Sequence, residues 1–242
     1  MARIAGLSLS LAGFVSVHLV FAHLIFWLAD IVFDRTIDAP ANVGIGAAIA
    51  IDLGLIVLFG LQHTGMARRG FKTLTARFVE PGLERTLYVW SAVAALFVLV
   101  RFYEPIPITI WHVESAIAQT MIWVAFAAGW AIAAAAYLSA GIFYLLGVSQ
   151  ALAWFREEPQ PPPPLVEGYA YRLVRNPQQL GLLIAFWSTP HMTIGHLVFA
   201  IGMSIYIVIG MVYEERDLIA AHGETYLAYK ARVPAILPRL WP

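Results

Sequence analysis

The stretch YAYRLVRNPQQLGLLIAFW, residues 169–187, joins a charged turn broken by a proline directly to an apolar run. The run continues to residue 213 and ends in four charged residues, Glu214, Glu215, Arg216 and Asp217. If the apolar run folds back on itself, the two charged clusters meet at the base of the hairpin. The stretch therefore predicts a site at a membrane surface.

The composition is that of an integral membrane protein. Sixty per cent of the 242 residues are hydrophobic, only 12% are charged, and the mean hydropathy is +0.74, whereas about a quarter of the residues are charged in soluble domains. Apolar runs occur at about residues 4–29, 43–61, 87–103, 116–146 and 180–213. Each of the first four is long enough to cross ~30 Å of hydrocarbon as a helix.

The fifth run is too long for one crossing, and Pro190 and several polar side chains interrupt it. We interpret it as a helical hairpin whose first arm, Leu180–Ser188, is short and partly re-entrant, because lipid-exposed turns would leave backbone groups unpaired. The sequence thus predicts an all-α integral membrane protein with about six transmembrane helices, or five with a short hairpin arm.

The positions of the basic residues predict the orientation. If the N-terminus lies inside and the chain crosses six times, every lysine and arginine except Arg35 and Arg101 falls on the inner side, as cytoplasmic loops require. We expect both termini in the cytoplasm, a bacterial-type inner membrane and no nucleic-acid partner. The chain has no cysteine, which excludes disulfides, thiolate metal sites and a cysteine nucleophile.

Two regions follow along the chain. Residues 1–146 are predicted to form a four-helix transmembrane scaffold with a basic inner loop at 63–86. After a proline-rich spacer, residues 147–242 carry the charged turn, the hairpin and a cytoplasmic tail. In the tail, Glu214–Ala221 extends the last membrane helix, His222-Gly223 stops it, and a short helix follows from Glu224 to Arg232.

The turn before residue 177 presents cationic side chains at the mouth of a helix. Arg172 and Arg175 precede Asn176-Pro177, and guanidinium and backbone donors placed there suit a carboxylate or a phosphate. The alternative is a topology anchor, since membrane helices often begin with arginine. Gln178, Gln179 and Gly181 favour a ligand, because amides are uncommon at a membrane entry without something to contact.

Glu214, Glu215 and Asp217 stand at the end of a membrane helix, where the helix dipole already carries negative charge. They require compensation, either from Arg216, Lys230 or Arg232 or from a cationic or multiply hydroxylated ligand. His18 and His23 are five residues apart and share no helix face, so no metal site is predicted.

The turn, the hairpin and the acidic exit together resemble the isoprenylcysteine carboxyl methyltransferase superfamily of membrane methyltransferases. Those enzymes have an Arg-His-Pro-x-Tyr-x-Gly turn, a later Glu-Glu pair, and a tail with Tyr-x-x-Tyr and Val-Pro. The matching residues here are Arg175, Pro177, Gly181, Glu214, Glu215, Tyr226, Tyr229 and Val233-Pro234. Asn176 and Gln179 stand where the superfamily has histidine and tyrosine.

The methanethiol S-methyltransferase branch resembles nearly the whole chain. The matching segments include Ile51-Asp52-Leu53, Leu61-Gln62-His63-Thr64, Glu84-Arg85-Thr86, Phe186-Trp187, Thr189-Pro190 and Gly195-His196-Leu197. This resemblance implies an S-adenosylmethionine-dependent transfer of a methyl group to a small thiol, most concretely from methanethiol to dimethyl sulfide.

The same resemblance implies roles for individual residues. His63 would act as a base or orient the thiol, Trp187 with Phe186 would hold the thiol, and Arg172 would belong to the catalytic set. Cofactor contacts would come from Arg175, Asn176, Gln179, Gly181, Glu214 and Glu215, with Tyr226, Tyr229 and Arg232 as a lid. No metal is implied.

Two other functions stay open at this point. The same fold could act on another lipophilic thiol or on a carboxylate. Alternatively, the chain could be a non-catalytic membrane subunit or binding protein that has lost the cofactor turn. The presence of Asn176 and Gln179 in that turn supports this alternative. The sequence also leaves open whether the protein works in a membrane complex or as a homo-oligomer.

Overall fold

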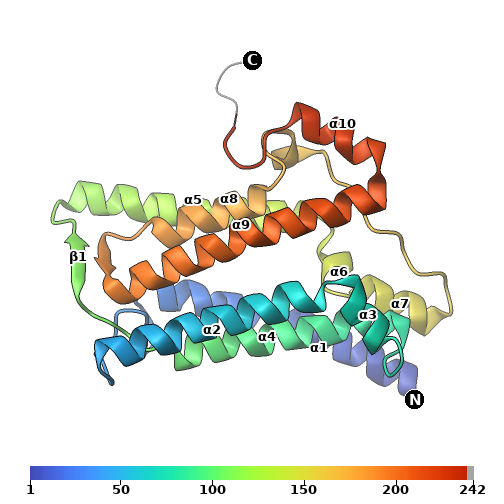
Figure 1. Cartoon of the computed structure of the whole chain (residues 1–242), viewed down its shortest axis with the longest axis horizontal. Helices are drawn as coiled ribbons and strands as arrows, with labels where there is room; N and C mark the ends of the chain where they lie inside the picture. Colours follow the sequence, from blue (N-terminus) through green and yellow to red (C-terminus); the bar gives the residue numbers. More distant parts are fainter. Residues whose placement is uncertain (239–242) are drawn as a thin grey trace. The chain divides into compact units, whose positions relative to one another are not determined.

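The computed structural model describes residues 1–238, and for residue 69 it describes the backbone alone. The end of the predicted tail, 239–242, lies outside the described residues. Among the described residues, five helical segments are long and apolar enough to cross a membrane (Figure 1). They are α1 (Ala2–Leu28), α2 (Ile45–Met66), α4 (Glu84–Phe102, preceded by the 3-10 turn η1, Pro81–Leu83), α5 (Ala116–Ser139) and α9 (Ile194–His222). The protein is therefore mostly helical and membrane-spanning, as predicted.

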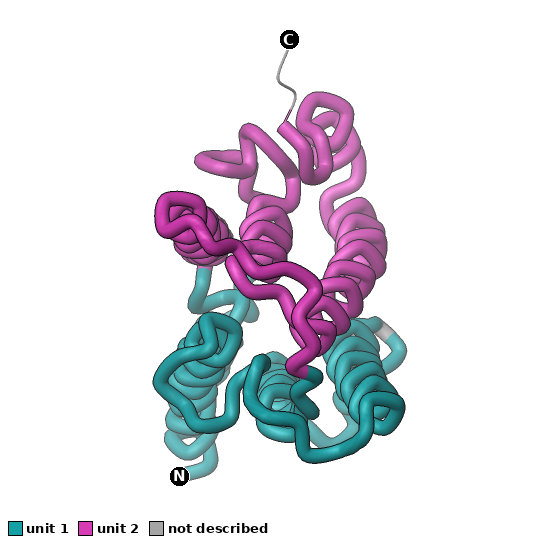
Figure 2. The backbone as a smooth tube through the Cα atoms, turned by 90° about the vertical axis from the view of Figure 1, so that its left-hand side faces the viewer, with its two compact units in different colours: residues 1–106, 142–163 teal, residues 107–141, 164–242 magenta. Residues whose placement is uncertain are grey.

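The shorter elements connect these spans. They are α3 (Arg69–Thr75), α6 (Ile142–Leu145), α7 (Val148–Arg156), the 3-10 turn η2 (Tyr169–Arg172), α8 (Pro177–Trp187), α10 (Glu224–Arg232) and the strands β1 (Thr109–His112) and β2 (His191–Thr193). The chain divides into two compact units, residues 1–106 with 142–163, and 107–141 with 164 onward (Figure 2). Compactness thus groups α5 with the second half, whereas the boundary predicted at residue 146 follows chain order.

The first unit packs α1, α2 and α4 together and contains a charged group within α2. Asp52 is fully buried, and its Oδ1 accepts a hydrogen bond of 2.8 Å from the backbone N–H of Glu104. Glu104 Oε1 in turn accepts a hydrogen bond of 2.9 Å from Arg35 Nη2. The hydrogen bond to Asp52 lowers the cost of burying a carboxyl group in a membrane-spanning helix, which is otherwise high.

The fourth apolar run does not form one helix to residue 146 as expected. α5 ends at Ser139, and the chain turns at Gly141 (φ +84°) and again at Gly147 (φ +82°). Glycine adopts this left-handed conformation without strain and so ends helices. Gly141 therefore separates α6 from the membrane span α5, and Gly147 separates α7 from α6.

In the second unit, α8 packs against α5 in antiparallel orientation at unusually short distance. A Cβ on Gly181 would lie 2.5 Å from the backbone nitrogen of Ala133, and a Cβ on Gly129 would lie 2.7 Å from that of Ala185. Small residues allow such close approach between membrane helices. Gly181 therefore serves helix packing, and its partner Gly129 was not singled out from the sequence.

The first arm of the hairpin is short, and it is not helical throughout. α8 has 11 residues, or ~16 Å at 1.5 Å per residue, about half a bilayer core. Beyond Trp187 the chain is extended and forms β2, which pairs antiparallel with β1. The all-α prediction is thus wrong at this point, because a small two-stranded sheet completes the arm.

Strand pairing satisfies the backbone of this extended segment. Pro190 O accepts a hydrogen bond of 2.9 Å from Val113 N, and Ile194 N donates to Ile108 O at 2.9 Å. Proline cannot continue a helix, and unpaired backbone groups are not tolerated in hydrocarbon. The segment that interrupts the fifth apolar run therefore needs β1 as its partner.

The tail follows the prediction closely. α9 continues beyond the apolar run to His222, Gly223 adopts a positive φ of +54°, and α10 spans Glu224–Arg232. The predicted helix stop and the following short helix are both confirmed.

The contact between α5 and α8 predicts a specific sensitivity to added volume. We expect Gly181→Ala to lower the free energy of unfolding by about 1–3 kcal/mol, because the new methyl group meets backbone atoms that cannot move aside. Thermal unfolding in detergent measures the change. Gly210→Ala on α9 is the matched control, since a Cβ there meets no atom within 4 Å. Equal midpoints for the two variants would contradict the interpretation.

Candidate active site

The charged turn before α8 and the acidic end of α9 meet in the second unit, as the hairpin predicted. The Arg175 guanidinium donates from Nη2 and Nε to Glu215 Oε1, at 2.6 and 2.9 Å. Both side chains are largely withdrawn from solvent, with 9% of Arg175 and 14% of Glu215 exposed. The pair is therefore short, shielded and charge-assisted, the stronger class of hydrogen bond.

The same pair also holds the C-terminal tail. Glu215 Oε2 accepts from Lys230 Nζ at 2.6 Å. The Arg175 Nη1 group donates to the backbone carbonyls of Lys230, at 3.2 Å, and of Val233. One arginine thus ties the turn, α9 and the end of α10 together, and the predicted compensation of the acidic exit by Lys230 is confirmed for Glu215.

Backbone groups of the turn pair with the tail as well. Arg175 N donates to Pro234 O at 2.8 Å, and Asn176 N donates to Ala235 O at 3.0 Å. The buried Asn176 side chain adds a bond from Nδ2 to the same Ala235 carbonyl, at 3.1 Å. Asn176 therefore holds the tail.

The two adjacent glutamates have different surroundings. Glu215 is engaged by two cations, whereas Glu214 is exposed and accepts a hydrogen bond of 3.1 Å from Gln179 Nε2. Consecutive helical residues point about 100° apart, so the two carboxylates face different directions. Glu214, with Gln179 beside it, is the carboxylate that a ligand can reach.

The two tail tyrosines lie in a small core. Tyr226, Tyr229 and Val233 are buried together, with Leu165, Leu218 and Ile219 packed against them. The rings of Tyr226 and Tyr229 are 5.8 Å apart, in agreement with their sharing one helix face. Tyr229 also donates from its hydroxyl to Tyr171 O at 2.7 Å. The tyrosines predicted as a lid thus pack α10 onto the rest of the unit.

Three phenols around the site are held neutral. Burial raises the pKa of Tyr171 to about 12, and the Glu214 carboxylate adds to the shift. Burial raises the pKa of Tyr226 to about 12 with help from Glu215, and burial and the neighbouring Tyr226 raise that of Tyr229 to about 12. At neutral pH these groups donate hydrogen bonds and cannot act as bases.

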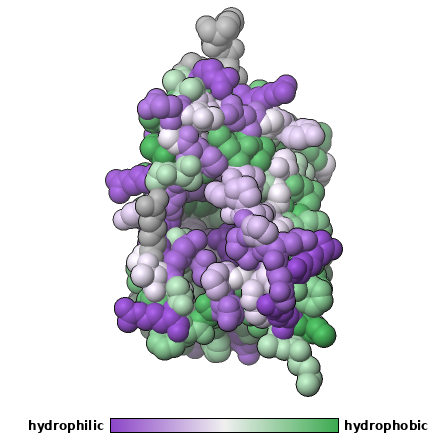
Figure 3. All heavy atoms as spheres, turned by 90° about the vertical axis from the view of Figure 1, so that its right-hand side faces the viewer, coloured by the Kyte–Doolittle hydropathy of each residue, from purple (hydrophilic) through white to green (hydrophobic). Residues whose placement is uncertain are grey.

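A polar pocket of about 340 Å³ lies beside the turn and the tail. Its lining residues are Glu167, Arg172, Tyr229, Arg232 and Val233. Arg232 forms an ion pair of 2.9 Å with Glu167. Figure 3 shows many hydrophilic side chains, with hydrophobic ones among them, on the side of the molecule that faces right in Figure 1. With two guanidinium groups and a carboxylate, the pocket suits a zwitterionic ligand.

Three of the predicted site residues make other contacts. His63 belongs to the first unit, where it lies between the rings of Phe59 and Tyr88, at 5.4 and 5.2 Å. Trp187 stands at the far end of α8, ~15 Å along the helix from its start, and donates to Ser204 Oγ at 3.0 Å. Gly181 lies in the contact with α5.

Tyr171 was not predicted as a site residue. Its hydroxyl donates to Ala136 O on α5 at 3.4 Å, and its carbonyl accepts from Tyr229. It therefore joins α5 to the tail beside Glu214. Its position in the charged turn, four residues before Arg175, was a weak signal.

Comparison with known proteins finds relatives along nearly the whole chain. A methanethiol S-methyltransferase of Mycobacterium tuberculosis is 38% identical over 96% of this chain and 94% of its own length. One from a Pseudomonas species is 39% identical over 98% of this chain and 91% of its own length. Human nurim is 29% identical over 79% of this chain and 72% of its own length. No protein-family model matches, and no solved structure matches.

The bonds of Arg175 predict that its loss frees the tail. We expect Arg175→Ala to speed tryptic cleavage after Lys230 and Arg232 by about tenfold, which corresponds to ~1.4 kcal/mol of local stability. Arg216→Ala is the control, because this substitution removes the same charge from a side chain that lies over the Tyr213 ring instead of holding the tail. Cleavage at the same rate in both variants would show that Arg175 does not hold the tail.

The three neutral phenols predict alkaline release of the tail. Their pKa values of about 12 in the folded protein exceed the ordinary value near 10, so ionisation favours the released form. The contribution of these phenols to holding the tail is fully present below pH ~10 and is lost between pH ~10 and ~12. Tyrosinate absorbance and tryptic release measured together test this, and Tyr226→Phe should weaken the pH dependence. Unchanged release between pH ~9 and ~11 would contradict it.

Proposed function

The chain belongs to the methanethiol S-methyltransferase family, and from this premise we propose that it is a membrane-embedded, S-adenosylmethionine-dependent enzyme that methylates methanethiol to dimethyl sulfide. The observation that supports this most directly is the joining of the family's turn and acidic exit into one cluster by Arg175 and Glu215. A pocket of mixed charge adjoins that cluster.

The side chains present fit the proposed methyl donor. S-adenosylmethionine supplies an electrophilic methyl group on a sulfonium, and it carries a carboxylate, an ammonium group and a ribose. Arg172 and Arg232 would bind the carboxylate, since guanidinium groups match its geometry. Glu214, with Gln179 beside it, would accept hydrogen bonds from ribose hydroxyls or face the cationic groups.

Other predicted contacts take a positioning role in this proposal. Three of them, Arg175, Asn176 and Glu215, form hydrogen bonds with the tail, and Arg175 and Glu215 also bond to each other. We assign them to holding the wall of the site, so that the reactive geometry is kept without reorganisation at the moment of reaction. Tyr226 and Tyr229 keep α10 in place behind them.

The reaction itself makes few demands on the protein. The acceptor sulfur bonds to the methyl carbon as the bond from that carbon to the sulfonium breaks, and the thiol proton is released. The protein must bring the thiol sulfur to ~3–3.5 Å from the methyl carbon, in line with the bond that breaks, and exclude water. His63 stays the predicted base or orienting group. Trp187 stays a predicted thiol contact, although it lies at the other end of α8 from the turn.

We propose that both termini face the cytoplasm of a bacterial-type inner membrane, with the site on that side. The distribution of lysine and arginine supports this orientation. A charged donor does not cross the hydrocarbon, whereas a one-carbon thiol does, so the site would take its two substrates from different phases.

Calorimetry with S-adenosylmethionine on the detergent-purified protein tests the proposal. We expect saturable binding that Glu214→Gln weakens about tenfold or more, because it removes a charged acceptor. Glu158→Gln is the matched control, since Glu158 is exposed in the linker before the proline-rich segment. Dimethyl sulfide formed from methanethiol is then followed by gas chromatography.

The outcomes separate the remaining readings. Binding without dimethyl sulfide, but with methylation of a larger lipophilic thiol or a carboxylate, would support the same site with another acceptor. If the folded protein does not bind S-adenosylmethionine, the proposed methyltransferase activity is refuted, and the hypothesis of a non-catalytic membrane subunit is favoured.

A further inference from the structure

The short length of α8 leaves part of α5 without a helical neighbour on that side. α5 has 24 residues and α8 has 11. The close contacts of Gly129 with Gly181 and Ala185 fix their antiparallel register. α8 therefore ends before it reaches the first turns of α5, and the extended segment after Trp187 takes its place.

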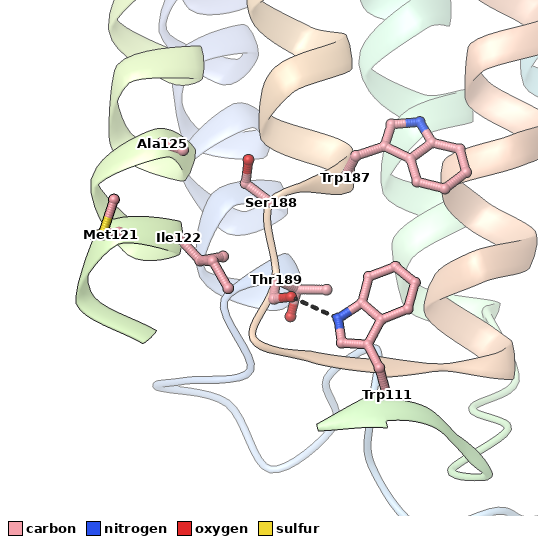
Figure 4. A pocket seen from close by; sticks show the side chains of 7 residues that line it. All are labelled: Trp111, Met121, Ile122, Ala125, Trp187, Ser188 and Thr189. Atoms are coloured by element: carbon pink, nitrogen blue, oxygen red, sulfur yellow. Dashed lines mark hydrogen bonds between the residues drawn. The ribbon is translucent and has the colours of Figure 1, made fainter. Parts of the chain in front are cut away.

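A pocket of about 410 Å³ lies beside this extended segment, at the other end of α8 from the charged cluster. It is lined by Trp111, Met121, Ile122, Ala125, Trp187, Ser188 and Thr189. Figure 4 shows the α5 side chains on one side, the two tryptophans on the other, and Ser188 and Thr189 between them. The walls are mainly apolar, as in most ligand pockets.

One polar group in the wall is available to a ligand. Trp111 Nε1 is already used, since it donates to Thr189 O at 3.1 Å. The Ser188 backbone N–H is used within the last turn of α8. The Ser188 hydroxyl is drawn between the two walls (Figure 4), so it can donate a single hydrogen bond to an acceptor inside the pocket.

The surroundings of the pocket indicate what reaches it. Ile108, Ile110, Ile117 and Val124 stand close in sequence to lining residues and are exposed and apolar, as lipid-facing side chains of membrane proteins are. Trp111, Trp123 and Trp187 are also partly exposed, and tryptophan gathers at the level of the lipid headgroups and ester groups. The pocket is therefore open to the upper part of lipid chains.

We propose that this pocket binds one phospholipid, whose acyl chain lies between the two walls and whose ester carbonyl accepts the hydrogen bond of Ser188. An acyl chain in the pocket would make van der Waals contacts with the apolar side chains of both walls. None of the lining residues belongs to the charged cluster, and Ala125, Val124 and Ser188, which the tests below change, have no role in the proposed methyltransferase activity, although the lining residue Trp187 is a predicted thiol contact.

Native mass spectrometry of the detergent-purified protein, titrated with palmitoyl-oleoyl phosphatidylethanolamine, tests the proposal. Wild type should retain one lipid more tightly than any other. Ala125→Phe should weaken that retention about tenfold, since the ring occupies the space of the chain. Val124→Phe is the matched control on the next position of α5, where the side chain is 63% exposed to lipid, and it should bind as wild type does.

The hydrogen bond has its own test, which also covers failure of Ala125→Phe to fold. Ser188→Ala should weaken retention of the ester lipid about threefold, as loss of one hydrogen bond does. An ether-linked analogue, which lacks the carbonyl, should bind wild type and Ser188→Ala equally. Equal retention of the ester lipid by all variants, or a loss in Val124→Phe as large as in Ala125→Phe, would overturn the proposal.

Discussion

The ion pair between Arg175 and Glu215 is the interaction on which the proposed site depends. The arginine occupies the turn before α8, and the glutamate stands on α9. Through carbonyls and Lys230 the pair also holds the tail. Because both groups are shielded from water, removing the arginine would leave Glu215 with Lys230 alone, and removing the glutamate would leave Arg175 without a carboxylate. Either change costs more than the loss of a surface pair. The turn, the acidic exit and the tail can therefore occupy their places only together.

The two departures from the superfamily's turn become intelligible within this arrangement. Asn176 uses both its backbone and its side-chain amide on one tail carbonyl. Gln179 reaches Glu214 on the neighbouring helix. Both amides thus make hydrogen bonds that keep the cluster assembled, although neither offers an aromatic face. A site built this way would bind its ligand through charge and hydrogen bonds rather than through stacking.

Hydrophobic runs and local signals made much of this predictable. The long spans follow from apolar length, and the break at Gly223 follows from a glycine after a charged helix end. The meeting of Arg175 with the acidic exit follows from a hairpin. The pairing of β1 with β2 was not predictable, because it joins segments about 80 residues apart and each strand is too short for a periodic signal. The role of Gly181 depends on Gly129, and glycines are frequent in membrane helices for many reasons.

The bonds from the turn to Pro234 and Ala235 have a consequence for the order of synthesis. All five spans precede these residues in the chain, so they are synthesised before the carbonyls that the turn requires. Formation of the membrane helices and assembly of the site can therefore be separate events in time. A chain cut just before Pro234 would keep every span but would lack the two carbonyls that hold the turn.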